Sequence, residues 1–159
     1  MKIRRGARIA VFQTLFEVDL VNHAASASLQ QRLKDAPLPP SGVNFAKYLL
    51  AGVLRYQKAF DAIIQRIAPE WPIDQIAVVD RNVLRLAAFE ILVDDDVPPK
   101  VAINEAVELA KMFGSESSSR FVNGVLGTLF ANKDEFSASL DLLMEADAVS
   151  SDKPVECGV

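Results

Sequence analysis

Prolines divide this chain into long stretches in which apolar residues recur every three or four positions. All but one of the eight prolines fall in three short clusters, at residues 37–40, 69–72 and 98–99. Proline lacks a backbone N–H and clashes with the turn before it, so these clusters are expected to lie between helices. Apolar residues at that spacing form one face of an α-helix. The pattern therefore predicts an all-α fold with sharp breaks and argues against a many-stranded sheet.

The helical pattern covers most of the chain. Seven segments show it, and they run approximately over residues 3–20, 26–34, 43–68, 73–93, 100–113, 115–130 and 133–146. We expect about seven helices, and we leave open an extra helix at the C-terminal end. Residues 1–148 are long enough for one domain with its own hydrophobic core. The polar residues 149–159 are expected to form a disordered tail.

The segment at residues 73–93 is apolar on almost every side, which is typical of a buried central helix. Its charged exceptions near the start are Asp80, Arg81 and Arg85, and they face either a binding partner or a neighbouring helix in an internal ion pair. Gly52 lies in the middle of the third predicted helix, where glycine costs about 1 kcal/mol relative to alanine. Its presence there predicts close packing of another helix.

The charge of the chain is unevenly distributed. The formal net charge is −4, but four of the 17 lysine and arginine residues lie in the first eight positions, as Lys2, Arg4, Arg5 and Arg8. Because arginine is rarely buried without a partner, we expect the first helix to extend beyond the core and carry these groups into solvent. The negative net charge argues against indiscriminate nucleic-acid binding, whereas a local basic patch can still hold a short phosphate backbone.

The composition also excludes several classes of protein. The chain has one cysteine and one histidine, which indicate no disulfide framework, no metal site and no cofactor site. No apolar run reaches the ~18 residues of a membrane span, and the N-terminus lacks the pattern of a signal peptide. We therefore expect a cytoplasmic protein without catalytic residues, metal or cofactor.

The stretch from residue 98 to residue 130 contains two predicted helices that meet at Gly114 and a serine-rich turn. Gly114 matches a glycine that ends a helix. The second helix carries small or polar residues on its outer face, where solvated helices usually carry lysine and glutamate. These residues are Ser118, Arg120, Asn123, Gly124 and Gly127. This composition favours a docking surface over a catalytic site.

Four segments of the chain carry recognisable motifs. The longest is KVAINEAVELAKMFGSESSSRFVNGVL at residues 100–126, and it is accompanied by FAKYLLAGV at residues 45–53 and VDRNVLRLAAFEIL at residues 79–92. An RRxAR box at the start of the first helix is formed by Arg4, Arg5, Ala7 and Arg8. Together these motifs resemble the NusB family of transcription antitermination factors over residues 4–130. The long motif is specific, whereas the RRxAR box alone would be a weak signal.

The resemblance implies two packed helical bundles and a non-catalytic role. NusB-like proteins bind the boxA element of nascent ribosomal RNA leader transcripts together with the ribosomal protein that also acts as NusE. The complex joins RNA polymerase and other Nus factors and suppresses premature termination. Carried over residue by residue, the RNA surface is expected to comprise Lys2, Arg4, Arg5, Arg8, Ser117, Ser118, Arg120, Phe121 and Asn123. The NusE surface is expected to include Phe16, Asp74 and Asp80.

These residue types suit RNA. Phosphates are bound by arginine and lysine, and single-stranded bases need amide or hydroxyl groups and a stacking surface. The spacing of Phe121 also makes it a core residue, so both interpretations stay open. The chain departs from the family at Ser117, where an acidic residue is frequent, and at Gly127, where the family often has aspartate. Loss of a carboxylate lowers repulsion of RNA, so we expect RNA binding no weaker than is typical of the family.

Two other functions compete with this one. A NusB-like domain also occurs at the N-terminus of rRNA cytosine methyltransferases, but their catalysis needs a large α/β domain with a glycine-rich cofactor loop and a nucleophilic cysteine. The 159 residues contain no such segment, and the single cysteine is Cys157 in the polar tail, so an enzyme is not expected. The second alternative is a protein-only scaffold or homodimer of the same fold, in which the RNA surface is masked or lost.

Overall fold

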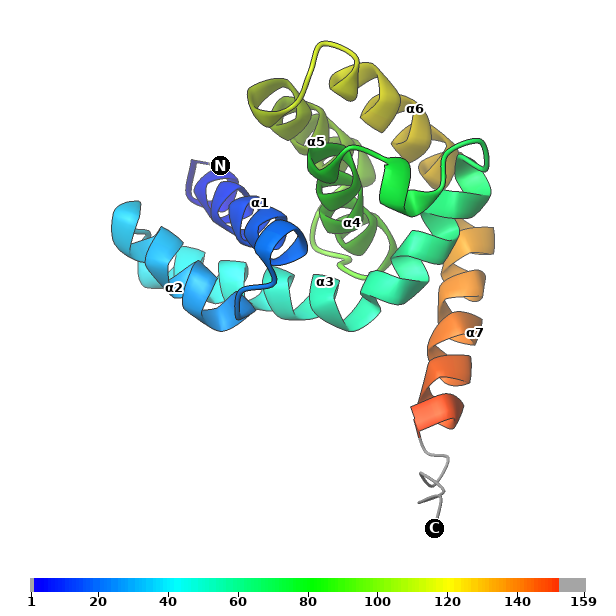
Figure 1. Ribbon diagram of the computed structural model, residues 1–159, viewed down its shortest axis with the longest axis horizontal. Helices are drawn as coiled ribbons and strands as arrows, with labels where there is room; N and C mark the ends of the chain where they lie inside the picture. The colour runs from blue at the N-terminus through cyan, green and yellow to red at the C-terminus, as the bar shows by residue number, and fades with distance from the viewer. Residues whose placement is uncertain (1, 152–159) are drawn as a thin grey trace.

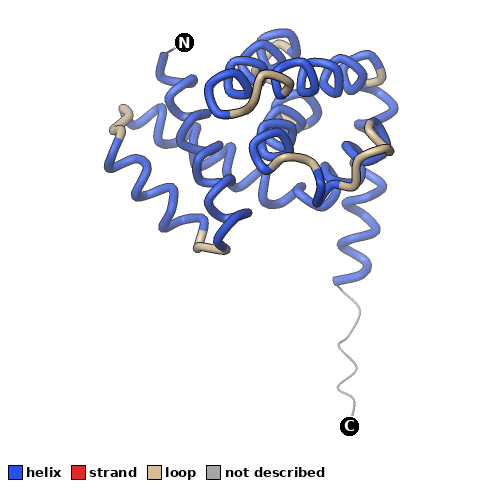
Figure 2. Tube along the Cα trace, turned by 45° about the horizontal axis from the view of Figure 1, so that its top comes forward, coloured by secondary structure: helices blue, strands red, loops and turns tan. Residues whose placement is uncertain are grey.

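The computed structural model describes residues 2–151, and this part of the chain is almost entirely helical (Figure 2). The α-helices are α1 (Lys2–Val21), α2 (Ala25–Asp35), α3 (Pro40–Ile67), α4 (Val78–Leu92), α5 (Pro99–Phe113), α6 (Ser118–Ala131) and α7 (Lys133–Ser151). A short 3-10 helix, η1 (Ile73–Gln75), lies between α3 and α4. The prediction of an all-α fold is confirmed, and within residues 2–151 no helix is both long enough and apolar enough to cross a membrane.

The helices form two packed bundles that share α3 (Figure 1). One bundle comprises α1, α2 and the start of α3, and the other comprises α4 to α7 with the rest of α3. With 28 residues, α3 is about 42 Å long. It meets Ile3 of α1 at Gly42, Phe89 of α4 at Gly52 and α7 near its own end. A single long helix therefore holds the two bundles together.

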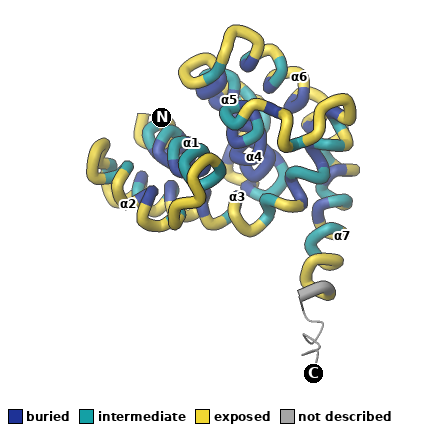
Figure 3. The backbone as a smooth tube through the Cα atoms, in the orientation of Figure 1, coloured by how far each residue is buried: buried dark blue, intermediate teal, exposed yellow. Residues whose placement is uncertain are grey.

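The central helix is α4. Every residue from Asn82 to Ile91 is buried, and the tube of α4 lies in the dark-blue centre of Figure 3. It is surrounded by α1, α3, α5 and α6. The helix apolar on every side is thus confirmed as a central helix. It begins at Val78 rather than near residue 73, because residues 73–75 form η1.

The C-terminal end differs from the prediction. Helix α7 continues to Ser151, so the expectation that a disordered tail begins at residue 149 is wrong. Residues 152–159 lie outside the described part of the chain, and for them the expectation stays a prediction.

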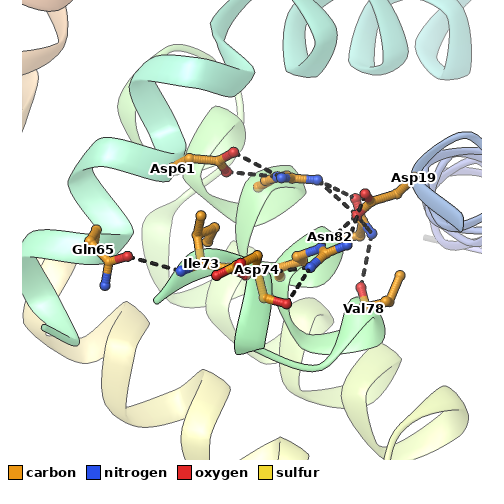
Figure 4. A network of polar contacts seen from close by, with 9 residues as sticks. Asp19, Asp61, Gln65, Ile73, Asp74, Val78 and Asn82 are labelled. Atoms are coloured by element: carbon orange, nitrogen blue, oxygen red, sulfur yellow. Dashed lines mark hydrogen bonds and ion pairs between the residues drawn. The ribbon is translucent and has the colours of Figure 1, made fainter. Parts of the chain in front are cut away.

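A network of ion pairs joins the start of α4 to α1 and α3 (Figure 4). The Arg85 guanidinium donates to both carboxylate oxygens of Asp61 at 2.8 Å and to Asp19 at 3.1 Å. Asp19 also accepts hydrogen bonds from Arg81 at 2.7 and 2.9 Å and from Asn82 at 2.9 Å. Burial acts to raise the pKa of Asp19, but these hydrogen bonds and the two arginine charges hold the pKa below its usual value. For Arg81 and Arg85 the structure therefore favours internal ion pairs over an external partner.

Gly52 marks a close contact between α3 and α4, as its position predicts. A Cβ at Gly52 would lie 2.2 Å from Cε2 and 2.4 Å from Cζ of the Phe89 ring. Phe89 is buried, and its ring centroid lies 5.3 Å from that of Tyr48 and 6.4 Å from that of Tyr56. The ring has little room to move away, so glycine is required at this position.

We predict that Gly52→Ala lowers the free energy of unfolding by about 1–3 kcal/mol, the usual cost of overpacking, although alanine favours helix by ~1 kcal/mol. Gly124→Ala is the matched control, because a Cβ at Gly124 meets nothing within 4 Å. The control should be neutral or more stable by up to about 1 kcal/mol. Chemical denaturation of the three proteins measures both effects, and equal stability of Gly52→Ala and the parent chain would contradict the contact.

Candidate functional site

Arg8 lies inside the fold. Its side chain is 6% exposed, and Nε and Nη2 donate to the two carboxylate oxygens of Glu90 at 2.8 and 3.1 Å. Burial raises the pKa of Glu90, and the hydrogen bond and charge of Arg8 act in the opposite direction. The expectation that the N-terminal arginines reach solvent is therefore wrong for Arg8. The sequence signal for this pair is Glu90, a carboxylate in the apolar second half of the central helix, because such groups are almost never buried unpaired.

The cationic groups that α1 presents to solvent are Lys2, Arg4 and Arg5. The Arg5 side chain is 49% exposed and donates two hydrogen bonds to Glu105 of α5, at 3.1 and 3.0 Å. Glu105 raises the pKa of Arg5, so the guanidinium remains a cation. Arg4 is exposed, and its Cζ lies 4.5 Å from the centroid of the Phe45 ring of α3. Among the described residues, Arg4 thus has an oriented guanidinium without a carboxylate contact like that of Arg5.

The turn between α5 and α6 is closed by serine hydroxyl groups. The Ser115 backbone N–H donates to Ser118 Oγ at 3.0 Å, and Ser115 Oγ lies 3.1 Å from Ser117 Oγ. Gly114 ends α5 with φ of −101°, which any residue can adopt. A Cβ at Gly114 would lie 2.4 Å from Ser118 Oγ and 2.8 Å from the Ala110 carbonyl oxygen. The predicted helix end is confirmed, but glycine is required by this close approach.

Two side chains expected at binding surfaces are buried beneath this turn. Ser118 is 2% exposed and Asp80 is 8% exposed. Among the described residues Asp80 Oδ1 finds no hydrogen-bond partner. Burial raises the pKa of Asp80, and the adjacent Ser118 hydroxyl acts in the opposite direction. The burial contradicts the expected exposure of both groups and places them at the joint between α4 and α6.

The outer face of α6 is polar and free of carboxylates. Residues 118–131 contain no aspartate or glutamate, and Arg120, Asn123 and Gly124 are exposed. Ser117 is exposed immediately before the helix. Phe121 is half-buried and packs against the core, so its position agrees with a core role and leaves one part of the ring accessible.

Helix α5 lies between the α1 cations and the outer face of α6. Glu105, near its middle, holds Arg5, whereas Phe113, its last residue, contacts Phe12 with ring centroids 4.9 Å apart. Positions 105 and 113 are eight residues apart, which is about 12 Å along a helix. Figure 1 shows α5 between α1 and α6, with the loop into α6 leaving the end of α5. Helix α5, which packs against α6 and pairs with Arg5 of α1, therefore lies between the α1 cations and the α6 face.

A separate depression of about 220 Å³ lies between α1, α2, α4 and the end of α5. It is lined by Phe12, Gln13, Phe16, Arg32, Val79 and Phe113. Phe16 is half-buried and Phe113 is 36% exposed. Asp74 is exposed on η1. In residues 2–151 no cluster of three or more histidine, cysteine, aspartate or glutamate side chains is placed to hold a metal ion.

Comparison with known proteins identifies the family. A model described as the NusB family matches residues 5–130. The transcription antitermination protein NusB of Chloroflexus aggregans is 49% identical over 128 residues, which cover 79% of this chain and 85% of that protein. The chain belongs to the NusB family. The NusB protein of Roseiflexus sp. is 44% identical over 135 residues, which cover 84% of this chain and 95% of that protein.

Solved structures of NusB-family proteins share the fold. T. maritima NusB superimposes with a TM-score of 0.76 at 35% identity, covering 80% of this chain and 90% of that one. A chain from the crystal structure of antitermination factors NusB and NusE in complex with dsRNA gives a TM-score of 0.76 at 27% identity. The match covers 82% of this chain and 98% of that one. A chain from the crystal structure of a plectonemic RNA supercoil gives a TM-score of 0.80 at 28% identity, and the match covers 84% of this chain and 97% of that one. Two of these three structures are thus described with RNA.

We predict that Arg8→Ala lowers the free energy of unfolding by about 3–5 kcal/mol, because it leaves the Glu90 carboxylate buried without its counter-charge. The control is Arg4→Ala, which removes an exposed cation–π contact worth about 0.5–1 kcal/mol. Replacing both partners, as Arg8→Met with Glu90→Leu, should recover most of the stability, since apolar pairs often substitute for buried ion pairs. Urea denaturation of the four proteins tests the series, and a small effect of Arg8→Ala would refute the pairing.

We also predict a pH-dependent effect of Asp80→Asn. Because the pKa of Asp80 is raised in the folded chain, its contribution to stability is full below the unfolded pKa of about 3.9 and is lost as pH rises through the folded pKa. The stability of Asp80→Asn relative to the parent chain should therefore increase between pH 4 and pH 7. Denaturation at both pH values measures this difference, with exposed Asp74→Asn as the control for loss of one negative charge. A difference that does not change with pH would refute the assignment.

Proposed function

We propose that this chain is a transcription antitermination factor that binds RNA. The proposal is supported by its membership of the NusB family, by the names of its relatives and by a similar chain solved with NusE and dsRNA. The observation that carries it is the presence of exposed cations on α1 and of an exposed α6 face that lacks carboxylates, with α5 between them. In finer terms, we propose that it binds boxA-type RNA of nascent rRNA transcripts together with NusE, within an RNA polymerase complex that contains other Nus factors.

The exposed side chains supply the chemistry that this role requires. Arg4 offers a planar guanidinium for a phosphate, and Arg120 offers a second one at the start of α6. Asn123 and Ser117 supply amide and hydroxyl groups for single-stranded bases. Arg5 is shared with Glu105 at 3.0 Å, so a phosphate would have to compete with that carboxylate. No step in this role requires a catalytic residue.

Arg8 contributes indirectly. Its guanidinium lies 5.5 Å from the Phe45 ring centroid, and that of Arg4 lies 4.5 Å from the same centroid. Since Arg8 is fixed by Glu90, it anchors the turn of α1 that carries Arg4 against this ring. We therefore assign Arg8 to positioning Arg4 rather than to phosphate contact.

The depression beside Phe16 is the surface that we propose for NusE. It combines apolar rings with the cationic Arg32 at its edge, and buried aromatic groups often dominate protein interfaces. Asp74, exposed on η1, lies next to α4 and belongs to the same proposed surface. Asp80 is buried near the start of α4 beside Ser118, so we do not assign it to direct contact with NusE.

A protein-only scaffold of the same fold is the second candidate. The observation that favours it is the engagement of Arg5 and Arg8 by carboxylates, which leaves fewer unshared cations for a phosphate backbone. The two candidates differ in the salt dependence of RNA binding, because a cation that neutralises a phosphate releases counterions from the RNA.

We predict that Arg4→Ala and Arg120→Ala each weaken binding of a boxA-type single-stranded RNA. Each variant should also flatten the plot of log K against log salt by about 0.7 for every phosphate that it no longer neutralises. Arg66→Ala is the matched control, because Arg66 is 52% exposed at the far end of α3, where it pairs with Glu135. Filter-binding titrations at several salt concentrations measure the slopes.

The same titrations, and a gel shift, should be run with and without the NusE-type protein. An unchanged salt slope for both variants would favour the scaffold over the RNA-binding factor. Tighter RNA binding in the presence of the second protein is the expected result for joint recognition, and failure of the parent chain to bind RNA in either condition would refute the proposed function.

A further inference from the structure

The second half of α7 carries an apolar stripe that faces solvent. Leu142 is 67% exposed and Val149 is 64% exposed, and residues seven apart lie on the same side of a helix. The opposite side of α7 packs against the core through Leu143 and Met144. Figure 1 shows this half of the helix extending away from the two bundles. Exposed apolar groups in register on one face are typical of a binding surface.

Acidic side chains accompany this stripe. Asp141 and Glu145 are exposed on the same half of α7, and on a helical wheel both lie along one edge of the line from Leu142 to Val149. The family model matches residues 5–130, so this surface lies beyond the matched residues.

A groove of complementary character lies between α2 and α3. Its volume is about 650 Å³, and its lining includes Leu29, Leu33, Val43, Leu50 and Leu54. Lys34 and Lys47 also line it, and none of the described residues that line it is acidic. Both lysines are exposed. The groove is thus apolar along its length and positively charged at its edge.

We propose that the second half of α7 of one copy of the chain occupies the groove between α2 and α3 of a second copy. Leu142 and Val149 would enter the apolar groove, as the anchors of a helix in a groove do, and Asp141 and Glu145 would face Lys34 and Lys47. Every copy carries both surfaces, so two such contacts related by a two-fold axis close into a dimer. This proposal is independent of the proposed RNA function, because the two use different residues.

Sedimentation equilibrium of the full chain over a range of concentrations tests the dimer. We expect dimerisation of the parent chain, and a rise of at least tenfold in the dimer dissociation constant for Leu54→Glu in the groove and for Leu142→Glu on α7. Leu20→Glu is the matched control, because Leu20 is 58% exposed on α1 and outside the groove. A parent chain that remains monomeric, or a dimer that survives either variant, would overturn the proposal.

Mixing the two variants identifies which surfaces meet. The Leu54→Glu chain keeps an intact α7 and the Leu142→Glu chain keeps an intact groove, so their mixture should regain one contact and form a heterodimer. If α7 instead paired with α7, or groove with groove, one of the two single variants would keep its dimer and the proposal would fail. In a Cys157→Ser background, Ala51→Cys in the groove and Ala146→Cys on α7 should form a disulfide between chains and not within one. Circular dichroism confirms that each variant is folded.

Discussion

The charges buried on α4 are the constraint on which the rest of the structure depends. Arg85 and Glu90 are 5% and 2% exposed, and a buried charge that loses its partner destabilises a fold by several kcal/mol. Their partners come from other helices, with Asp61 on α3, Asp19 on α1 and Arg8 on α1. Apolar faces alone would tolerate several registers between these helices, whereas the ion pairs are satisfied in one. We therefore interpret them as the interactions that set how the two bundles meet.

This constraint divides the RRxAR box between structure and recognition. Arg8 belongs to the interior pair, while Arg4, one turn earlier, remains exposed above the same Phe45 ring. The rigid placement of Arg8 thereby orients a neighbour that is free to meet a phosphate. Arg5 is intermediate, because Glu105 holds its guanidinium in a fixed orientation but also offsets its charge. On the proposed RNA surface we therefore expect the affinity for a phosphate to depend more on Arg4 and Arg120 than on Arg5.

Much of the fold could be predicted because helix formation here is signalled locally. Apolar spacing and the proline clusters located the seven helices, and the lone Gly52 signalled a close helix contact. The errors in exposure at Arg8, Asp80 and Ser118 have a different origin. A helical wheel shows which residues share a side, but not which distant group packs against it. Glu90 is 82 positions from Arg8, and no local pattern connects them.

Asp80 relates the two proposed surfaces to each other. Its neighbour Val79 lines the depression proposed for NusE, while Asp80 itself lies beneath Ser118, where α6 begins. Asp80 Oδ1 finds no hydrogen-bond partner among the described residues, and a buried oxygen without a partner costs stability. A partner that moved the start of α4 would alter the same contact that positions α6. If binding of the partner changes the affinity of the chain for RNA, then binding of RNA must change its affinity for the partner by the same factor. The contact between Asp80 and Ser118 lies between the two proposed surfaces, and it is the place in this fold where binding of the partner and of RNA would be coupled.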